Sequence, residues 1–254
     1  MWRGDLLYLV RNLVLKDFKV RYRNMSLGML WSLLNPLVMM GILTFVFTMI
    51  FPNKTVDHFA VFVLTGMVPY NFFSLAWATS SASIVESADF IKRVNVPREM
   101  IPLTAVLSTA LNMAAQVALL FALVLFFGYG VNRYWLLLPV VWGLEIAFVC
   151  GLGLITGTLA VFIRDTRYVV ESVNLVMFWL VPIFYPFSAI PPQLQPLYQY
   201  NPVAALVLAS RNILLEGVAP SGELLLKLAL VSFGTLAVGS FTFRHWKRQF
   251  YDYL

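Results

Sequence analysis

Charge is absent between Arg23 and Lys54, directly after a segment that is crowded with positive charge. About 20 consecutive apolar residues are enough to cross a bilayer, so this uncharged stretch can form a membrane-spanning helix. Four of the eight residues from position 16 to 23 are Lys or Arg, and only Asp17 opposes them. A cationic helix that runs straight into an apolar one is typical of a chain that passes from the membrane surface into lipid. The sequence therefore predicts an interfacial segment over residues 1–26 and a first span over 27–51.

The whole chain has the composition of a membrane protein. Of its 254 residues, 60% are hydrophobic and 12% are charged, whereas soluble domains carry about 25% charged residues. Apolar runs separated by short polar turns predict an all-α polytopic membrane protein with a single domain over residues 1–254. The six expected transmembrane helices cover residues 27–51, 59–84, 101–127, 135–163, 169–187 and 223–243.

The distribution of Lys and Arg sets the expected orientation. If both termini are cytoplasmic, 14 of the 18 Lys and Arg residues fall on the cytoplasmic side. Cytoplasmic loops of membrane proteins carry an excess of these two residues. We therefore expect six spans with the N-terminus and the C-terminus both inside the cell.

One polar segment of some size lies between the spans, at residues 86–99. Ser83 followed by Glu86 fits a capping box, and Pro97 cannot continue a helix. A short helix between these signals is expected to present apolar side chains on one side, with cations beside them. The apolar members are Phe90, Ile91 and Val94, and the cations are Lys92 and Arg93.

Residues 172–210 carry no charge over 39 positions, yet their prolines prevent two ordinary spans. These prolines are Pro182, Pro186, Pro191, Pro192, Pro196 and Pro202. Residues 188–217 are therefore expected to be irregular or interfacial, and irregular backbone at membrane depth must be covered by protein or line a cavity. Asn201 as a cap and Pro202 at the first helical position predict a short helix that is re-entrant or surface-lying.

Motifs for catalysis and for metal binding are absent from the sequence. The phosphate-cradling pattern G-x-x-x-x-G-K-[ST] does not occur, so we expect no ATP site in this chain. His58 and His245 are predicted on opposite sides of the membrane, so they cannot join in a metal site or a Ser-His-Asp triad. The intramembrane acid Glu145 has two open interpretations, a hydrogen-bonded structural carboxyl or a group that faces a polar conduit. The single cysteine, Cys150, is expected to be a buried, inert thiol.

Two further patterns lie within the expected spans. Gly151, Gly153 and Gly157 permit another helix to pack closely against the fourth span. Aromatic residues are abundant, and they either face lipid or form the wall of a conduit in which their rings stack on sugars. The candidates for a conduit are Trp31, Tyr70, Phe73, Trp77, Phe178, Trp179 and Tyr185.

Four motifs stand at characteristic places along the chain. They are KDFKVRYRNMSLGMLWSLLNP at residues 16–36, FIKRVNVPREMIP at 90–102, RDTRY at 164–168 and YNP at 200–202. With these motifs and their spacing, the sequence resembles the membrane subunit of type-2 ABC exporters along essentially its whole length. The branch that it resembles most exports lipid-linked polysaccharides, such as capsule, O-antigen and teichoic acid.

The resemblance implies a permease of the cytoplasmic (inner) membrane that is not itself catalytic and holds no cofactor and no metal. Two copies would form a homodimer and associate with two copies of a separate ATPase, which binds ATP and Mg. A lipid-linked polysaccharide would pass between the two permeases, with membrane lipids around them and no role for nucleic acid.

The resemblance also implies roles for three groups of residues. A cytoplasmic gate that meets the lipid pyrophosphate would comprise Lys16, Lys19, Arg21, Tyr22 and Arg23. Coupling to the ATPase would use Glu86, Phe90, Ile91, Lys92, Arg93, Val94, Pro97, Arg98 and Glu99. An outer gate would involve Pro191, Pro192, Tyr198, Asn201, Pro202 and Arg211.

Three alternatives stay open. The cations before the first span can serve as topology anchors alone. The same fold can export drugs or simple lipids, although the aromatic fifth span and the proline-rich segment after it argue against this. A membrane-embedded enzyme acting on lipid-linked substrates would need clustered acids or histidines at one interface, and the sequence shows none.

Overall fold

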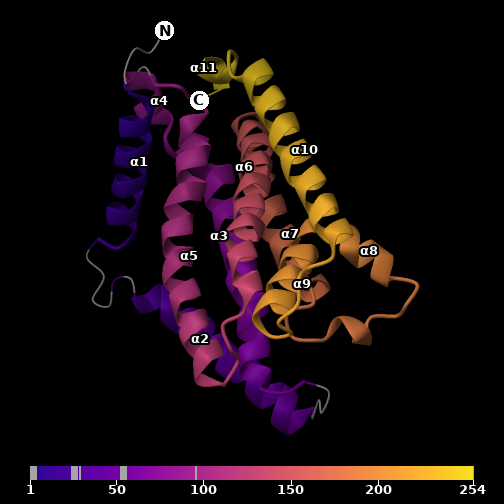
Figure 1. Cartoon of the computed structure of the whole chain (residues 1–254). Coiled ribbons are helices and arrows are strands. Elements are labelled where there is room, and N and C mark those ends of the chain that lie inside the picture. Colours follow the sequence, from indigo (N-terminus) through magenta and orange to yellow (C-terminus); the bar gives the residue numbers. More distant parts are fainter. Residues whose placement is uncertain (1–4, 24–27, 29, 52–55, 95, 254) are drawn as a thin grey trace.

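The computed structural model describes residues 5–23, 28, 30–51, 56–94 and 96–253, and no strand occurs within these ranges. The helices are α1 (Leu6–Arg21), α2 (Leu30–Phe45), α3 (Phe59–Glu86), α4 (Ala88–Arg93), α5 (Met100–Phe126), α6 (Leu138–Phe162), α7 (Thr166–Leu180), α8 (Gln195–Tyr200), α9 (Pro202–Leu214), α10 (Gly222–Trp246) and α11 (Phe250–Tyr253). A π-helical turn (Val46–Ile50) extends α2, and a 3-10 turn (Arg133–Leu137) precedes α6. Figure 1 shows α4 and α11 at the same end of the molecule, beyond the long helices.

Among the described residues, five helical segments are long and apolar enough to cross a membrane. They are Leu30–Ile50, Phe59–Glu86, Met100–Phe126, Arg133–Phe162 and Gly222–Trp246. A helix satisfies its backbone N–H and C=O groups internally, and lipid offers those groups no other partner. The chain is therefore an all-helical, multi-pass membrane protein, as the sequence predicts.

The structure differs from the prediction at the expected fifth span, residues 169–187. The helix found there, α7, has 15 residues and ends at Leu180. It rises about 22 Å, whereas the hydrocarbon core of a bilayer is about 30 Å thick. Pro182 ends the helix because it has no N–H and forces the residue before it, Val181, into extended backbone. The six-span topology with both termini inside stays a prediction, and α7 is the element that decides it.

The central element is α3, against which α2, α5, α6, α7 and α9 all pack. Most of its 28 residues are buried, and Pro69 lies within it without ending it. In a soluble protein such a helix would belong to a core, and here it occupies the middle of the helical bundle. Every candidate site described below contacts α3 or a helix packed on it.

The closest helix contact joins α6 to α10. A Cβ atom placed on Gly151 would lie 2.5 Å from backbone atoms of Thr235, and Gly239 of α10 faces the backbone of Gly151 in return. Gly153 approaches Ser80 of α3 so closely that a Cβ atom would collide with its side chain. Small residues allow such approach between helices in lipid. The close packing predicted from the glycine-rich stretch is confirmed.

The capping box predicted at residues 83–86 is wrong. Helix α3 continues through Glu86, and the Ser83 hydroxyl donates a hydrogen bond to the carbonyl of Ser80 at 2.7 Å within the helix. A serine can donate to the preceding turn in this way without ending a helix, so the pattern also fits a helix interior. One residue, Ser87, separates α3 from α4.

Candidate functional site

The first part of the candidate site is α1 and the two residues after it. Asp5 caps the helix, and its carboxylate accepts a hydrogen bond from the N–H of Leu7 at 2.9 Å. Because α1 packs against α5, the five predicted gate residues divide into two sets. Those exposed are Lys16, Lys19 and Arg23, and those half-buried are Arg21 and Tyr22.

The half-buried pair bonds directly to α5. Arg21 Nη2 donates to Thr109 Oγ1 at 3.4 Å, and Tyr22 OH donates to Asn112 Oδ1 at 2.5 Å. Nearby, burial raises the pKa of Asp17 against the opposing effect of the neighbouring cations. These contacts hold the end of α1 on the bundle, and the role of the five residues as a gate stays a prediction.

A polar cavity of about 450 Å³ adjoins these contacts. Its wall draws on α1, α2, α3 and α5, and Arg21 and Tyr22 form one side of it. Four carboxamides that the sequence analysis did not single out also line it: Asn35, Asn71, Asn112 and Gln116. The signal that would have found them is a carboxamide on each of several otherwise apolar helices. One arginine beside several carboxamides suits a ligand that carries phosphate and hydroxyl groups.

The polar segment after α3 contains α4, and here the structure corrects one feature of the prediction. Ile91 is 3% exposed and packs in an apolar cluster with residues of α3, α5 and α10, so it forms no exposed tip together with Phe90. A helix of six residues is unstable by itself in water and needs such a buried side chain to fix it to the bundle. The exposed residues among those described in the segment are Glu86, Asp89, Lys92, Arg93 and Val94.

Phe90 connects α4 to α1. Its side chain is half-buried, and Lys16 Nζ lies 5.4 Å from the centre of its ring. This distance is within the range of a cation–π contact. The predicted coupling helix and the predicted gate helix are therefore in direct contact.

The end of the polar segment is tied to the chain just after α10. Lys247 Nζ lies 2.5 Å from Glu99 Oε1, and Arg98 Nη1 donates to the Lys247 carbonyl at 2.5 Å. Burial by itself would raise the pKa of Glu99, but the hydrogen bond and the charge of Lys247 lower it below its ordinary value. Pro97 precedes this pair and is half-buried.

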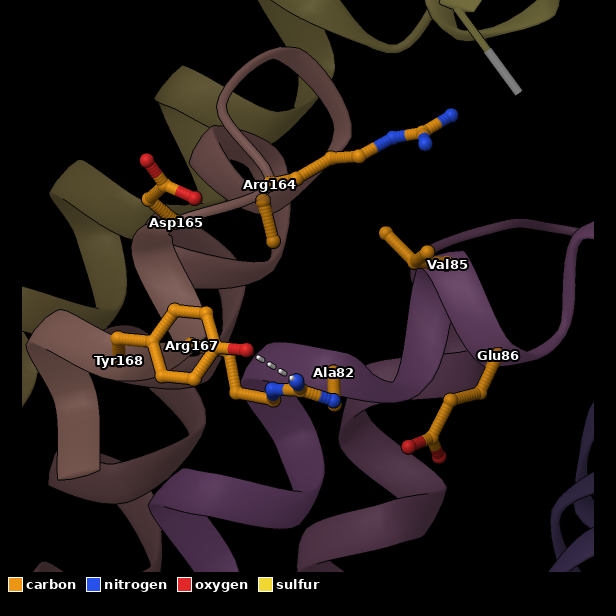
Figure 2. A pocket seen from close by; sticks show the side chains of 8 residues that line it. Ala82, Val85, Glu86, Arg164, Asp165, Arg167 and Tyr168 are labelled. Atoms are coloured by element: carbon orange, nitrogen blue, oxygen red, sulfur yellow. Dashed lines mark hydrogen bonds between the residues drawn. The ribbon is translucent and has the colours of Figure 1, made fainter.

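A second pocket, of about 350 Å³, lies where α3 ends and α6 turns into α7. Figure 2 shows Glu86 of α3 on one side of it and Arg164, Arg167 and Tyr168 of the RDTRY motif on the other. Arg167 Nη2 donates to Tyr168 OH at 3.1 Å. The RDTRY motif therefore shares a charged pocket with the first residue of the predicted coupling segment.

The seven candidate conduit aromatics do not form one open wall. Those buried inside the bundle are Tyr70, Phe73 and Trp77. Those exposed are Trp31 and Trp179, and those half-buried are Phe178 and Tyr185. The three aromatics of α3 pack within the subunit in this conformation, so they line no open surface of it. A conduit role for these aromatics stays a prediction. Exposed rings fit this role better than buried ones, because a passing sugar can reach them.

The predicted outer gate contains two short helices, α8 and α9. The Asn201 side chain caps α9 by accepting hydrogen bonds from the N–H groups of Val203 and Ala204 at 3.0 and 3.4 Å, and Pro202 is the first helical residue, as predicted. Because α9 is mostly buried against α3, α6 and α10, protein covers this helix, and the re-entrant and surface-lying alternatives both stay open. Of the remaining candidates, Pro191 and Pro192 are exposed and Tyr198 is half-buried.

Arg211 is a buried side chain that connects this outer segment to other helices. It is 4% exposed, and it donates to the carbonyls of Pro182 and Ile183 at 2.5 Å each and to that of Phe62 at 3.3 Å. The centre of its guanidinium lies 3.6 Å from the centre of the Phe62 ring. Arg211 therefore joins α9 to α3 and to the turn after α7, and it faces no open mouth.

Glu145 fits neither of its two interpretations in this conformation. It is fully buried, and neither carboxyl oxygen has a hydrogen-bond partner among the described residues. Cys150 is a buried free thiol, as expected. Within the described part of the chain, no group of three or more His, Cys, Asp or Glu residues is placed to hold a metal ion.

Comparison with known proteins gives consistent matches. Residues 8–215 match the family described as ABC-2 type transporter. The chain is 30% identical over 251 residues to the O-antigen export system permease protein RfbA of Klebsiella pneumoniae. The aligned region covers 98% of this chain and 95% of that protein. The chain is 27% identical to a protein of the same name from Myxococcus xanthus, with the same coverage. It is 28% identical to the polysialic acid transport protein KpsM of Escherichia coli over 92% of each chain.

Proposed function

Because the chain belongs to the ABC-2 type transporter family, we propose that it is the transmembrane subunit of an ATP-driven exporter of polysaccharide in the inner membrane. The observation that carries this proposal is the similarity to permeases named for O-antigen export and for polysialic acid transport. That similarity extends over 98% and 92% of the chain, respectively.

A separate ATPase subunit is part of the proposal, since the sequence lacks the phosphate-cradling pattern. The end of the molecule that carries α4 and α11 would receive it (Figure 1). At that end Lys92 and Arg93 are exposed beside the half-buried Phe90. Cations around an aromatic anchor suit a groove with an acidic rim. Motion of α4 would then reach α1 through the contact between Phe90 and Lys16.

Two permeases would form the working unit, with the polymer passing between them. Helix α7 supports this arrangement, because only Thr166, Val170 and Asn174 are buried on it. Its other faces expose large apolar side chains such as Val173 and Trp179. A second copy of the chain would cover part of this surface and lipid the rest.

The proposed substrate is the lipid-linked form of the polymer. Three exposed cations, Lys16, Lys19 and Arg23, lie on or just after α1 next to the half-buried Arg21. The guanidinium fork of arginine matches a pyrophosphate in a bidentate geometry that a lysine ammonium cannot reproduce. The end of α1 would thus bind the pyrophosphate head group, while the ATPase drives the polysaccharide across the membrane.

The test is ATP hydrolysis by the permease and its ATPase in proteoliposomes. We expect stimulation by a polyprenyl pyrophosphate-linked oligosaccharide, and none by a simple phospholipid or an amphiphilic drug. Stimulation by the phospholipid or the drug alone would replace the proposal with the alternative exporter function.

Arginine variants test the head-group contact in the same assay. Changing Arg21 and Arg23 together to Lys keeps the charge, so insertion should be unaffected while stimulation falls. The exposed Arg133, far from α1 in the chain, serves as the matched Arg→Lys control. Normal stimulation of the double variant would show that the two arginines are topology anchors alone.

A further inference from the structure

The cavity beside Arg21 contains more hydrogen-bonding capacity than the fold uses. Gln116 is 9% exposed, and its Nε2 donates to the Ser32 carbonyl at 3.2 Å, but its Oε1 is buried without a partner among the described residues. Arg21 donates through Nη2 to Thr109, while its Nη1 is likewise buried and unpartnered within the described part of the chain. Both residues line the cavity, so each has one polar group beside it that no described residue satisfies.

Such groups are costly in a membrane protein. A buried amide without a hydrogen bond destabilises the fold, and polar groups inside a membrane are by default candidates for a functional site. Four carboxamides, Asn35, Asn71, Asn112 and Gln116, converge on the cavity from α2, α3 and α5. Packing alone would be served better by apolar side chains at these positions. A ligand that completes the hydrogen bonds accounts for their presence.

The chemistry of the wall defines the class of ligand. Each carboxamide presents a donor and an acceptor side by side, which matches a sugar hydroxyl because the hydroxyl also donates and accepts. Trp31, 54% exposed, adds a ring face at the edge of the cavity against which the C–H groups of a sugar can pack. The volume of about 450 Å³ lies within the range of roughly 300–1,000 Å³ that small-molecule sites occupy.

We propose that this cavity binds the sugar next to the pyrophosphate of the exported polymer, with Gln116 and the three asparagines holding its hydroxyls and Arg21 holding the adjacent phosphate. The inference rests on the proposed function and deepens it, because it assigns sugar recognition to a pocket inside one subunit. Helix α1 forms one wall through the hydrogen bond from Tyr22 to Asn112. Movement of α1 would therefore open and close the site.

The experiment compares two ligands in the reconstituted ATPase assay. One is a polyprenyl pyrophosphate without sugar, and the other is the same lipid carrying one sugar of the native polymer. For the unmodified protein we expect half-maximal stimulation at a lower concentration of the sugar-bearing lipid. The variants Gln116→Met and Asn71→Leu keep side-chain size while removing the carboxamide. Each should raise the half-maximal concentration of the sugar-bearing lipid about threefold to tenfold, as expected for the loss of a neutral hydrogen bond, and leave that of the sugar-free lipid unchanged.

The outcomes separate the two claims. Gln249→Met is the matched control, because Gln249 is an exposed carboxamide near the other end of the chain, and it should change neither value. Equal effects of Gln116→Met on both lipids, or no effect on either, would overturn the sugar site while leaving the exporter function intact. Failure of the unmodified protein to respond to either lipid would overturn the proposed function itself. The accessibility of Cys150 to a thiol reagent reports whether each variant is folded, because this single cysteine is buried.

Discussion

Replacing Arg211 by Met is the sharpest test of how the outer segment is held together. The side chain is buried in α9 and donates to carbonyls in the turn after α7. Methionine fills a similar volume with no donor, so the substitution removes the hydrogen bonds with little change in packing. The prediction is that α9 loses its attachment to the turn and that the whole bundle becomes less stable.

The magnitude follows from the partners that Arg211 leaves behind. The carbonyls of Pro182 and Ile183 lose their charged donor, whereas the Phe62 carbonyl keeps the Thr65 hydroxyl, which donates to it at 2.7 Å. Two buried acceptors left unsatisfied cost about 2–6 kcal/mol together. The variant also avoids the desolvation of a cation, which offsets part of this loss. We expect a net loss of about 3 kcal/mol, which lowers the melting temperature by about 6–12 °C for a domain of this size.

The assay is thermal unfolding in detergent, followed by the reaction of Cys150 with a thiol-reactive dye. Cys150 is the single cysteine and lies in α6, which contacts α9, so its exposure reports loss of the bundle. Arg133→Met is the matched control, because Arg133 also lies over an aromatic ring, 4.8 Å from that of Tyr134, but is exposed. Contacts between exposed side chains contribute little to stability, so the melting temperature of Arg133→Met should stay within about 2 °C of that of the unmodified protein. An Arg211→Met variant that melts together with this control would refute the argument from the two carbonyls.

Three further predictions concern the helix contacts. Gly151→Ala should force α6 and α10 apart and lower the melting temperature markedly, because the new methyl group would lie 2.5 Å from the backbone of α10. Gly143 lies on the same helix with open space around it, so Gly143→Ala should be neutral or stabilising. Equal effects of the two substitutions on the melting temperature would contradict the packing argument. Phe90→Ala should weaken copurification of the ATPase by about 2 kcal/mol, an aromatic anchor's usual worth, whereas undiminished copurification would place the docking surface elsewhere. The ion pair between Lys247 and Glu99 should stabilise the fold above pH 4.5, the ordinary pKa of glutamate, and this stabilisation should be lost as the pH falls through the lowered pKa of Glu99. The melting temperature of the unmodified protein should therefore fall with pH in this window, and the melting temperature of Lys247→Met should depend less on pH.

The sequence by itself determined that this chain is a helical membrane protein. Uncharged apolar stretches such as residues 30–51 are stable in lipid as helices, because a helix satisfies each backbone group within its own segment. The cap at Asn201 is equally local, since it depends on one side chain and on the N–H groups of Val203 and Ala204, which follow it closely in the chain. Gly151 predicted that some helix could pack closely at that position, but the sequence did not say which one. These features were predictable because few residues determine them.

Only the tertiary structure decided which side of each helix faces protein. Lipid and a protein interior are both apolar, so hydrophobic pattern does not separate them, and the burial of Ile91 and of the α3 aromatics was not readable from the sequence. The burial of Arg211 depends on carbonyls 28, 29 and 149 positions away in the chain. The carboxamide cavity likewise needs α1, α2, α3 and α5 to meet. Such long-range contacts are fixed by how all the helices pack together, and no short stretch of residues carries that information.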